Sequence, residues 1–491
     1  MWLGIRSIIV YQINLFIMKH IGHVAIGSVI QQVLSIAIFM ILTHHLGATE
    51  YGMVAAALAL ATSIYNFSST WITPSIVKTG VAQLLHYSKL GDIYIIGGLI
   101  SLSFIMLGLF LVFFLKSFKI IDIQIYGGTT LLIMLLLGLF FIGLVRIGLQ
   151  ATQSFREYGY FLWMDKIFLF AIVIILFNYE QLNSQTALYA NAASMLLIAI
   201  LGLFYFCKKY VRLHVKTFSL SKFLKTTTPI FFATIALYFA SPPFVILLVS
   251  NLFELEQAGF VGVGFIIYGF FIQPIRWITP TLLPKFTIAM EYGDKSVLCD
   301  YVNKVIFPFT VLYSIGIVAF ISIILSMPII ISYLIGDDFQ PGIPVIILII
   351  NIVVAEVVHQ LLISMLYARQ QEKLILIATV ARSLFFILMV LLFSNSLLLI
   401  LIGLLVGSWI NVAVEIWALK DLFSWKIKMR MLIIFGLFTA LSFFILITND
   451  EIVLSICGFI FIILGIMTFE NRAIFLDYIQ QVGNSLHLLR K

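Results

Sequence analysis

Three arginines lie inside stretches of sequence that are otherwise apolar and long enough to span a membrane. They are Arg146 in FFIGLVRIGLQ, Arg276 in FFIQPIRWITP and Arg382 in LIATVARSLFF. Each lies about 13 Å along a helix from a flanking basic residue at the membrane boundary. At that depth an arginine without water or a partner costs about 3 kcal/mol. Guanidinium groups bind diphosphates through paired hydrogen bonds, so the three are candidate ligands for an anionic substrate. The alternative is that these long side chains snorkel to the headgroups.

Glu356 and His359 lie three residues apart in a further apolar stretch, VVAEVVHQLL. Residues three apart share one face of a helix, and a carboxylate beside an imidazole inside a membrane is typical of a site that couples transport to an ion. The coupled ion would be H+ or Na+. Two alternatives stay open: Glu356 is a structural counter-ion for one of the arginines, or it belongs to a polar cavity wall. Glu415, near the end of a later apolar stretch, is expected to be solvated.

The sequence does not predict a metal site, an organic cofactor or a catalytic residue. Cys207, Cys299 and Cys457 are far apart and lack the CxxC spacing of a zinc site. His44 and His45 are adjacent but have no third ligand near them in the sequence. Apart from a coupling ion, we therefore expect no cofactor.

The composition places these residues in a membrane protein. Of the 491 residues, 62% are hydrophobic and 10% are charged, and the mean hydropathy is +1.15. A soluble globular domain carries about 25% charged residues, so this chain lacks the polar surface of a soluble enzyme. The net charge of +8 would predict a nucleic-acid partner for a soluble chain. In a membrane protein the basic residues are first assigned to a side of the bilayer, and we expect no nucleic acid.

The apolar stretches predict an all-α polytopic membrane protein with about fourteen transmembrane helices, each near the roughly 20 residues that a bilayer core requires. With the N-terminus inside, all lysines and arginines except Lys116 and Lys119 fall on the inner side, as the positive-inside rule requires. Both termini are then cytoplasmic. The predicted spans are about 24–43, 52–72, 93–115, 127–149, 160–178, 187–207, 229–250, 258–281, 302–327, 342–367, 374–393, 396–418, 429–448 and 452–469.

The long basic loop near the middle of the chain predicts two halves. The predicted domains are an N-terminal bundle at 1–207, a cytoplasmic linker at 208–228, a C-terminal bundle at 229–420, and the last two helices with a tail at 421–491. The turn LGATEYG at 46–52 resembles LFELEQAG at 252–259, six predicted helices later. Because six is even, the two halves share one orientation. The short outer loops argue against a membrane glycosyltransferase or polymerase.

Three segments carry a resemblance to a known family. LGATEYGMVAAALALATSIYNF at 46–67, FELEQAGFVGVGFIIY at 253–268 and IGDDFQPGIPVIILIIN at 335–351 resemble the polysaccharide transporter family. This family contains the O-antigen and capsular repeat-unit flippases, within the superfamily of multidrug, oligosaccharidyl-lipid and polysaccharide flippases. The resemblance covers nearly the whole chain, and its motifs mark the joints between helices.

The resemblance implies two six-helix bundles facing each other in a V, with two additional C-terminal helices. It implies a flippase of the bacterial inner membrane that moves undecaprenyl-diphosphate-linked oligosaccharides to the outer leaflet for surface polysaccharide synthesis, alongside membrane lipids and a polysaccharide polymerase machinery. Lys78 falls where the family tends to carry a basic residue, which implies a substrate contact; the alternative is a positive-inside anchor. The chain departs from the family at Ser241-Pro242-Pro243, where the family often has an aspartate.

The residues and the resemblance together predict an alternating-access flippase for a lipid-linked oligosaccharide. Arg276, Arg382, Arg146 and Lys78 are its candidate substrate-binding residues, and Glu356 and His359 its candidate ion-coupling residues. The first alternative is a multidrug or cation exporter of the same superfamily, which would require acidic cavity residues. A lipid II flippase is the second.

Overall fold

The computed structural model consists of α-helices joined by short turns. It describes residues 2–73, 75–77, 90–118, 127–152, 154–211, 220–291, 299, 301–302, 306–369 and 371–447, together with 456–457, 460 and 463–464. Within these ranges the only β-type pairing is an isolated bridge between Leu90 and Val211. The predicted all-α class is confirmed.

Nine helices of the described ranges are long and apolar enough to cross a membrane, and a bent pair of helices makes a tenth candidate. The chain is thus a multi-pass membrane protein. Thirteen of the predicted spans coincide with described helical segments, while the last, 452–469, lies almost wholly outside the described residues. The helices are α1 (Trp2–Ser69), α3 (Asp92–Ser117), α4 (Thr129–Ala151), α5 (Phe155–Asn178), α6 (Ser184–Tyr210), α7 (Leu220–Tyr238), α8 (Pro242–Leu252), α9 (Leu255–Glu291), α11 (Phe307–Ser326), α12 (Pro328–Ile335), α13 (Ile343–Ala368), α14 (Glu372–Leu392), α15 (Leu397–Ala418) and α16 (Trp425–Ile447), with a 3-10 helix at Asp337–Gly342.

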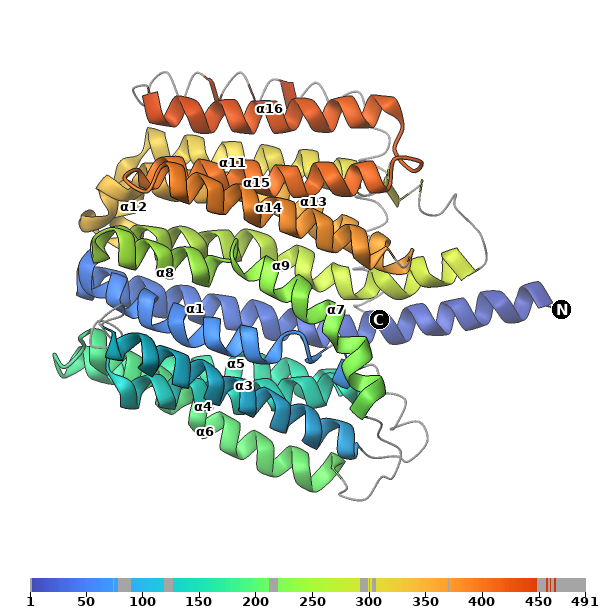
Figure 1. Ribbon diagram of the computed structural model, residues 1–491, viewed down its shortest axis with the longest axis horizontal. Helices are drawn as coiled ribbons and strands as arrows, with labels where there is room; N and C mark the ends of the chain where they lie inside the picture. The colour runs from blue at the N-terminus through green and yellow to red at the C-terminus, as the bar shows by residue number, and fades with distance from the viewer. Residues whose placement is uncertain are drawn as a thin grey trace. The chain divides into compact units, whose positions relative to one another are not determined.

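The chain divides into two compact units, Met1–Gly262 and Val263–Lys491, which we call unit 1 and unit 2. Unit 1 contains α1 to α8 and the start of α9, and unit 2 contains the rest of α9 and the helices from α11 onward (Figure 1). This division differs from the predicted bundles at 1–207 and 229–420, whose boundaries stay a prediction.

Glycines and prolines set the breaks and close contacts of unit 1. Gly47 has a φ of 70°, a conformation that favours glycine, and it kinks α1 between its first and second spans. Gly27 of α1 faces Gly159 of α5, where a Cβ on Gly27 would lie 2.4 Å from the Gly159 carbonyl oxygen. The predicted span 229–250 is a pair of helices, α7 and α8, bent by 41° just before Pro242, which occupies the first turn of α8.

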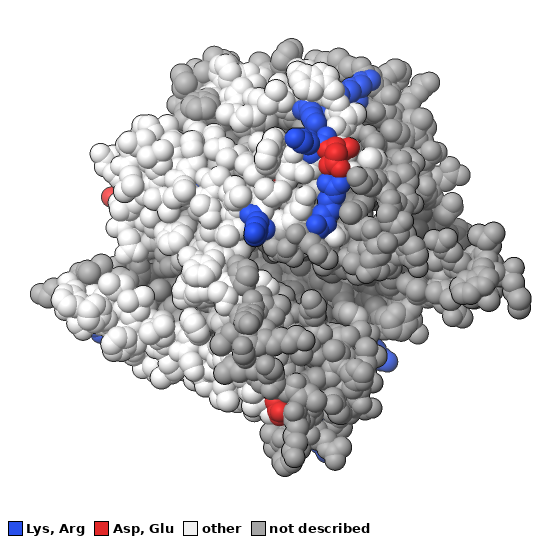
Figure 2. Space-filling view, turned by 45° about the vertical axis from the view of Figure 1, so that its right-hand side comes forward, with Lys and Arg blue, Asp and Glu red and all other residues white. Residues whose placement is uncertain are grey.

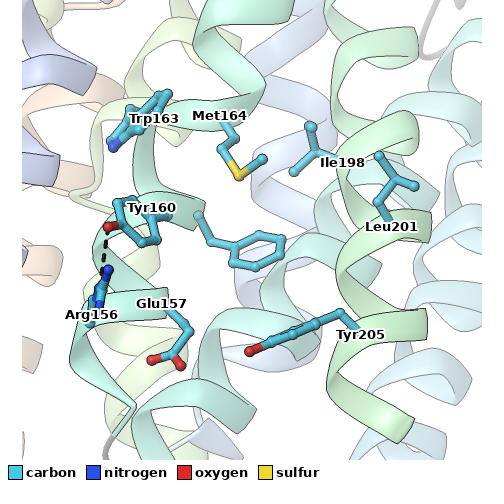
Figure 3. A pocket seen from close by; sticks show the side chains of 9 residues that line it. Arg156, Glu157, Tyr160, Trp163, Met164, Ile198, Leu201 and Tyr205 are labelled. Carbon is cyan, nitrogen blue, oxygen red and sulfur yellow. Dashed lines mark hydrogen bonds between the residues drawn. The ribbon is translucent and has the colours of Figure 1, made fainter. Parts of the chain in front are cut away.

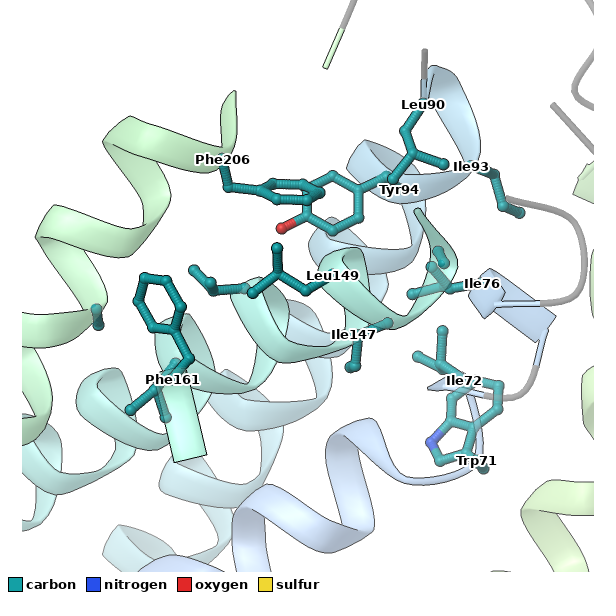
Figure 4. Close-up of a cluster of buried hydrophobic side chains, with 14 of the residues drawn as sticks. Trp71, Ile72, Ile76, Leu90, Ile93, Tyr94, Ile147, Leu149, Phe161 and Phe206 are labelled. Carbon is teal, nitrogen blue, oxygen red and sulfur yellow. The ribbon is translucent and has the colours of Figure 1, made fainter. Parts of the chain in front are cut away.

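A cluster of buried apolar side chains holds α3, α4, α5 and α6 of unit 1 together. Figure 4 shows Tyr94 beside Phe206, with Leu149 and Phe161 nearby. The Tyr94 hydroxyl donates to the Leu144 carbonyl oxygen at 3.0 Å, which satisfies its polar end inside the core. The cluster packs the C-terminal part of α4, which carries the candidate residue Arg146, against the N-terminal part of α5.

The central helix of unit 2 is α13. Every residue from Val345 to His359 is buried, and α13 packs against α11, α14, α15 and α16. The first part of this stretch, from Val345 to Ala355, is apolar except for Asn351, and such a helix requires a buried position.

The outer surface suits lipid. Large apolar side chains are exposed along many helices, including Phe110 of α3 (65%), Phe204 of α6 (74%) and Leu391 of α14 (74%). In the face shown in Figure 2, most described residues are uncharged; one group contains most of the visible charged side chains, and a few others lie apart from it. Such an apolar exterior would be unstable in water and is stable against acyl chains.

Candidate functional site: two charged clusters inside the helical units

The first charged cluster lies in unit 1, between α4 and α5. Arg146 Nη2 donates to Asp165 Oδ1 at 3.2 Å, and its Nη2 and Nε atoms donate to the Phe161 carbonyl oxygen at 3.0 and 3.3 Å. Lys166 Nζ lies 3.3 Å from Asp165 Oδ2. We call Arg146, Asp165 and Lys166 the basic cluster. Two cations share one carboxylate, so the cluster keeps a net positive charge.

The basic cluster is open to its surroundings on its cationic side. The Asp165 side chain is 3% exposed, whereas those of Arg146 and Lys166 are 26% and 18% exposed. Arg146 lies five residues before the last residue of α4, Ala151, which is about 8 Å along the helix. The sequence predicted a depth of about 13 Å for Arg146, measured from Arg156 along one helix. The depth is smaller because α4 ends at Ala151, before Arg156.

The second charged cluster lies in unit 2, among α13, α14 and α15. Arg382 Nη1 donates to Glu356 Oε2 at 3.0 Å, and Gln360 Nε2 donates to Glu356 Oε1 at 3.1 Å. The Arg382 and Glu356 side chains are only 8% and 10% exposed. The position of Arg382, ten residues into α14, makes this an ion pair deep within the helix. The pair is the counter-ion arrangement that the sequence left open as an alternative for Glu356.

His359 pairs with a residue that the sequence analysis placed elsewhere. Its Nδ1 atom lies 2.6 Å from Glu415 Oε1, and Asn411 Nδ2 lies 2.9 Å from the same nitrogen. The expectation that Glu415 is solvated is wrong, since its side chain is 0% exposed. Because α15 packs along α13, the residue faces the neighbouring helix instead of the inner boundary. We call Arg382, Glu356, His359, Glu415 and Asn411 the buried network.

The buried network contains polar oxygen atoms that the described residues do not satisfy. Glu415 Oε2 and Asn411 Oδ1 are buried, and neither has a hydrogen-bond partner within the described ranges. Asn411 Nδ2 donates to Glu415 Oε1 at 3.3 Å, one helical turn away. Buried acceptors without donors are costly, and their presence is typical of a site that binds a proton, a cation or water.

The distances in the buried network require a shared proton. A nitrogen and a carboxyl oxygen 2.6 Å apart repel each other unless a proton lies between them. The charges lead to the same conclusion, since two carboxylates and one guanidinium leave a negative charge that an imidazolium or a protonated carboxyl group would neutralise. A proton shared by His359 and Glu415 accounts for both the short contact and the charge balance.

The structure brings some of the predicted site residues together and leaves others apart or undescribed. It brings Arg382, Glu356 and His359 into one network within unit 2. Arg146 belongs to unit 1, and Arg276 lies on α9, where only the helix is described. Lys78 lies outside the described residues. The gathering of these cations around one cavity stays a prediction.

The sequence analysis missed Asp165, Glu415 and Asn411 as site residues. A signal existed for Asp165, which interrupts the apolar stretch FLWMDKIFLF, and for Glu415, which lies among apolar residues in INVAVEIWA. Rare carboxylates inside membrane spans mark buried pairs as strongly as arginines do. Asn411 offered no such signal, because a lone asparagine in a helix equally serves packing between helices.

Comparisons with solved structures show the fold. The chain is similar to a lipid II flippase, MurJ, in an inward closed conformation, with a TM-score of 0.63 and 14% identity over 91% of this chain and 99% of that one. It is similar to an inward-facing multidrug resistance transporter of the MATE family, of the MOP superfamily, with a TM-score of 0.54 and 13% identity over 80% and 94%.

A third similar structure is a MOP superfamily transporter from Pyrococcus furiosus, described as having a binding pocket of reverse polarity. Its TM-score is 0.52 and its identity 15%, over 83% of this chain and 96% of that one. No protein-family model and no curated protein sequence matches the chain. At these identities the likeness establishes the fold, which is that of the lipid II flippase and the MATE transporters.

Proposed function

We propose that this protein is a flippase that moves an undecaprenyl-diphosphate-linked oligosaccharide from the cytoplasmic to the outer leaflet by alternating access. It would act in the bacterial inner membrane with both termini in the cytoplasm, and would supply surface polysaccharide synthesis and its polymerase. The fold supports a role in transport, because the similar structures are a lipid II flippase and MATE-family transporters. The segments that resemble the polysaccharide transporter family support the particular cargo.

The observation that carries this proposal is the net positive charge of the basic cluster. Arg146 and Lys166 share the Asp165 carboxylate, so one positive charge stays available to an anion. A diphosphate offers several acceptor oxygens to a guanidinium, and the interaction strengthens away from bulk water. Arg276, Arg382 and Lys78 stay candidates for further substrate contacts. Arg382 would have to exchange its bond to Glu356 for the substrate, which makes it the weaker candidate.

Transport of a defined substrate tests the proposal. Proteoliposomes containing the protein and a fluorescent undecaprenyl-diphosphate oligosaccharide should show translocation that Arg146→Ala reduces at least about tenfold, since a hydrogen bond to a charged group contributes about 1.5–3 kcal/mol. The matched control is Lys116→Ala, which removes an exposed cation from the last turn of α3. Normal translocation by Arg146→Ala, or equal loss in Lys116→Ala, would contradict the role of the basic cluster.

We further propose that the buried network couples transport to a proton. Glu356 and His359 are the residues that the sequence predicted for coupling, and the contacts favour a division of roles between them. Glu356 is held by Arg382, whereas His359 shares a proton with Glu415. Release of that proton leaves the network with a negative charge inside the membrane. This cost would favour rearrangement of α13 against α15.

An imposed gradient tests the coupling. Translocation should increase with a pH gradient across the vesicle, and Glu415→Gln should abolish this increase while substrate binding persists. The control is Glu157→Gln, which removes a carboxylate in the first turn of α5, outside the network. Stimulation by a sodium gradient alone would contradict proton coupling and would leave Na+ as the coupling ion. Loss of binding in Glu415→Gln would show a structural role instead.

One observation favours a second candidate, a multidrug or cation exporter. The exporter requires acidic residues inside the membrane, and three carboxylates, Asp165, Glu356 and Glu415, are buried in the described spans. Two of them are held by arginines, which makes them poor sites for a cationic drug. Export of an organic cation that Glu415→Gln abolishes, in vesicles that do not move the lipid-linked substrate, would favour this candidate. A lipid II flippase would be recognised by translocation of lipid II in the same vesicles.

A further inference from the structure

A groove lies on the outside of unit 1, between the N-terminal part of α5 and the C-terminal part of α6. Its volume is about 550 Å3, within the range of small-molecule sites, which is about 300–1,000 Å3. Figure 3 shows the ring of Tyr160 and the side chain of Met164 on one side and Leu201 and Tyr205 on the other. The basic cluster and the buried network do not use this groove.

The interior of the groove is apolar and continuous with the exposed face of α6. Phe161 packs closely against α6 because Gly202 lacks a side chain: a Cβ there would lie 2.5 Å from the Phe161 ring. Leu201 lines the groove and is 55% exposed, and Phe204, three residues further on, is 74% exposed. Since exposed apolar side chains of this kind face acyl chains, the groove opens toward the hydrocarbon of the bilayer.

The mouth of the groove is basic and aromatic. Arg156 donates to the Tyr160 hydroxyl at 3.3 Å, and Lys209 donates to the Tyr205 hydroxyl at 2.9 Å and to Glu157 at 3.2 Å. Lys209 also lies 4.8 Å from the centre of the Tyr210 ring. Tyrosines with fixed cations beside them are typical of the headgroup level of a membrane. Their aromatic partners hold both cations at the rim.

The charge at the mouth indicates the kind of ligand. Arg156 and Lys209 bring two positive charges, and Glu157 is the one carboxylate among the groove-lining residues. The mouth is therefore positive beside an apolar groove, which complements a molecule with an anionic head and a hydrocarbon chain. The positive-inside distribution places this end of α5 and α6 at the cytoplasmic leaflet, where anionic phospholipids are found.

We propose that this groove is a binding site for an anionic phospholipid of the inner leaflet. One acyl chain lies between Met164 and Leu201, and the phosphate lies between Arg156 and Lys209. The bound lipid ties the inner ends of α5 and α6 together, and α5 carries Asp165 of the basic cluster. This site is independent of the cargo that the protein transports.

Native mass spectrometry of the full chain tests the proposal. After detergent exchange, protein supplied with phosphatidylglycerol should retain one lipid more strongly than protein supplied with phosphatidylcholine. Arg156→Gln/Lys209→Gln should raise the lipid concentration for half occupancy at least about tenfold, since each basic residue near an anionic surface contributes severalfold. The matched control is Lys208→Gln, which removes the adjacent exposed cation and leaves the contacts of Lys209 with Tyr205 and Glu157 in place.

A second variant keeps the charges and fills the groove. Leu201→Trp changes an exposed residue, so the fold tolerates it, and it should displace the lipid while Arg156 and Lys209 stay. Equal retention of phosphatidylcholine, or equal loss in Lys208→Gln, would contradict a specific site. Retention of undecaprenyl diphosphate in place of phosphatidylglycerol would overturn the proposal, because the groove would then hold a substrate tail. None of these results depends on whether the oligosaccharide is translocated.

Discussion

Unit 1 and unit 2 each hold a charged cluster inside their membrane-spanning helices, and the two clusters are balanced in opposite ways. The basic cluster of unit 1 has two cations for one carboxylate, and its cations are partly exposed. The buried network of unit 2 has two carboxylates for one arginine, and its side chains are at most 10% exposed. The first arrangement suits an anion that enters and leaves, and the second suits a proton held tightly.

An arginine inside a membrane span can therefore serve either as a ligand for an anion or as a structural counter-ion, and its sequence alone does not distinguish the two roles. Arg146 and Arg382 look alike in sequence, but one shares its carboxylate with a lysine and the other has a buried carboxylate of its own. The partner, and the exposure of the pair, decide whether the positive charge is available to a ligand.

The largest effect is expected from breaking the ion pair of unit 2. Arg382→Ala leaves Glu356 charged and buried, which should lower the free energy of unfolding by about 3–5 kcal/mol. The measurement is equilibrium unfolding in mixed micelles. Arg382→Met/Glu356→Gln removes both charges and should recover most of the loss. A double variant as unstable as Arg382→Ala would contradict the assigned pair.

A smaller effect is expected from the corresponding change in unit 1. Asp165→Asn removes the shared carboxylate from Arg146 and Lys166, whose partial exposure lets water solvate them. The free energy of unfolding should fall by about 1.5–3 kcal/mol, the range for a hydrogen bond to a charged group. The same variant should bind undecaprenyl diphosphate more tightly, as measured by fluorescence titration. Weaker binding would show that Asp165 positions Arg146 for the ligand.

The smallest effect is expected at a partly exposed ion pair outside the spans. Arg369 donates to both carboxylate oxygens of Asp421, at 2.9 and 2.5 Å, and this contact raises the pKa of Arg369. The Arg369 side chain is only 9% exposed, but that of Asp421 is 46% exposed, so water reaches the carboxylate and weakens the pair. Asp421→Asn should change the free energy of unfolding by less than about 1 kcal/mol. A loss of unfolding free energy as large as that of Arg382→Ala would show that burial does not explain the different contributions of the two ion pairs to stability.

Much of the helical architecture could be predicted from the sequence, because apolar stretches of bilayer length are a strong local signal. The turn near Gly47 and the spans of α13 and α15 follow from residue type and spacing, whereas the break before Pro242 lies inside a span that was predicted to be continuous. The partners of the charged residues could not be predicted. Glu415 lies 56 residues from His359, and Asp165 lies 19 residues from Arg146, so each pair depends on which helices pack together.

The sequence by itself determined that the protein is a polytopic helical membrane protein and which spans contain charged residues. These properties depend on local hydrophobicity, since a backbone inside lipid must form its hydrogen bonds within a helix. Only the tertiary structure decided which charge neutralises which. Packing of α4 with α5 and of α13 with α14 and α15 sets the distance and burial of each pair, and these determine the energy of a charge inside a membrane.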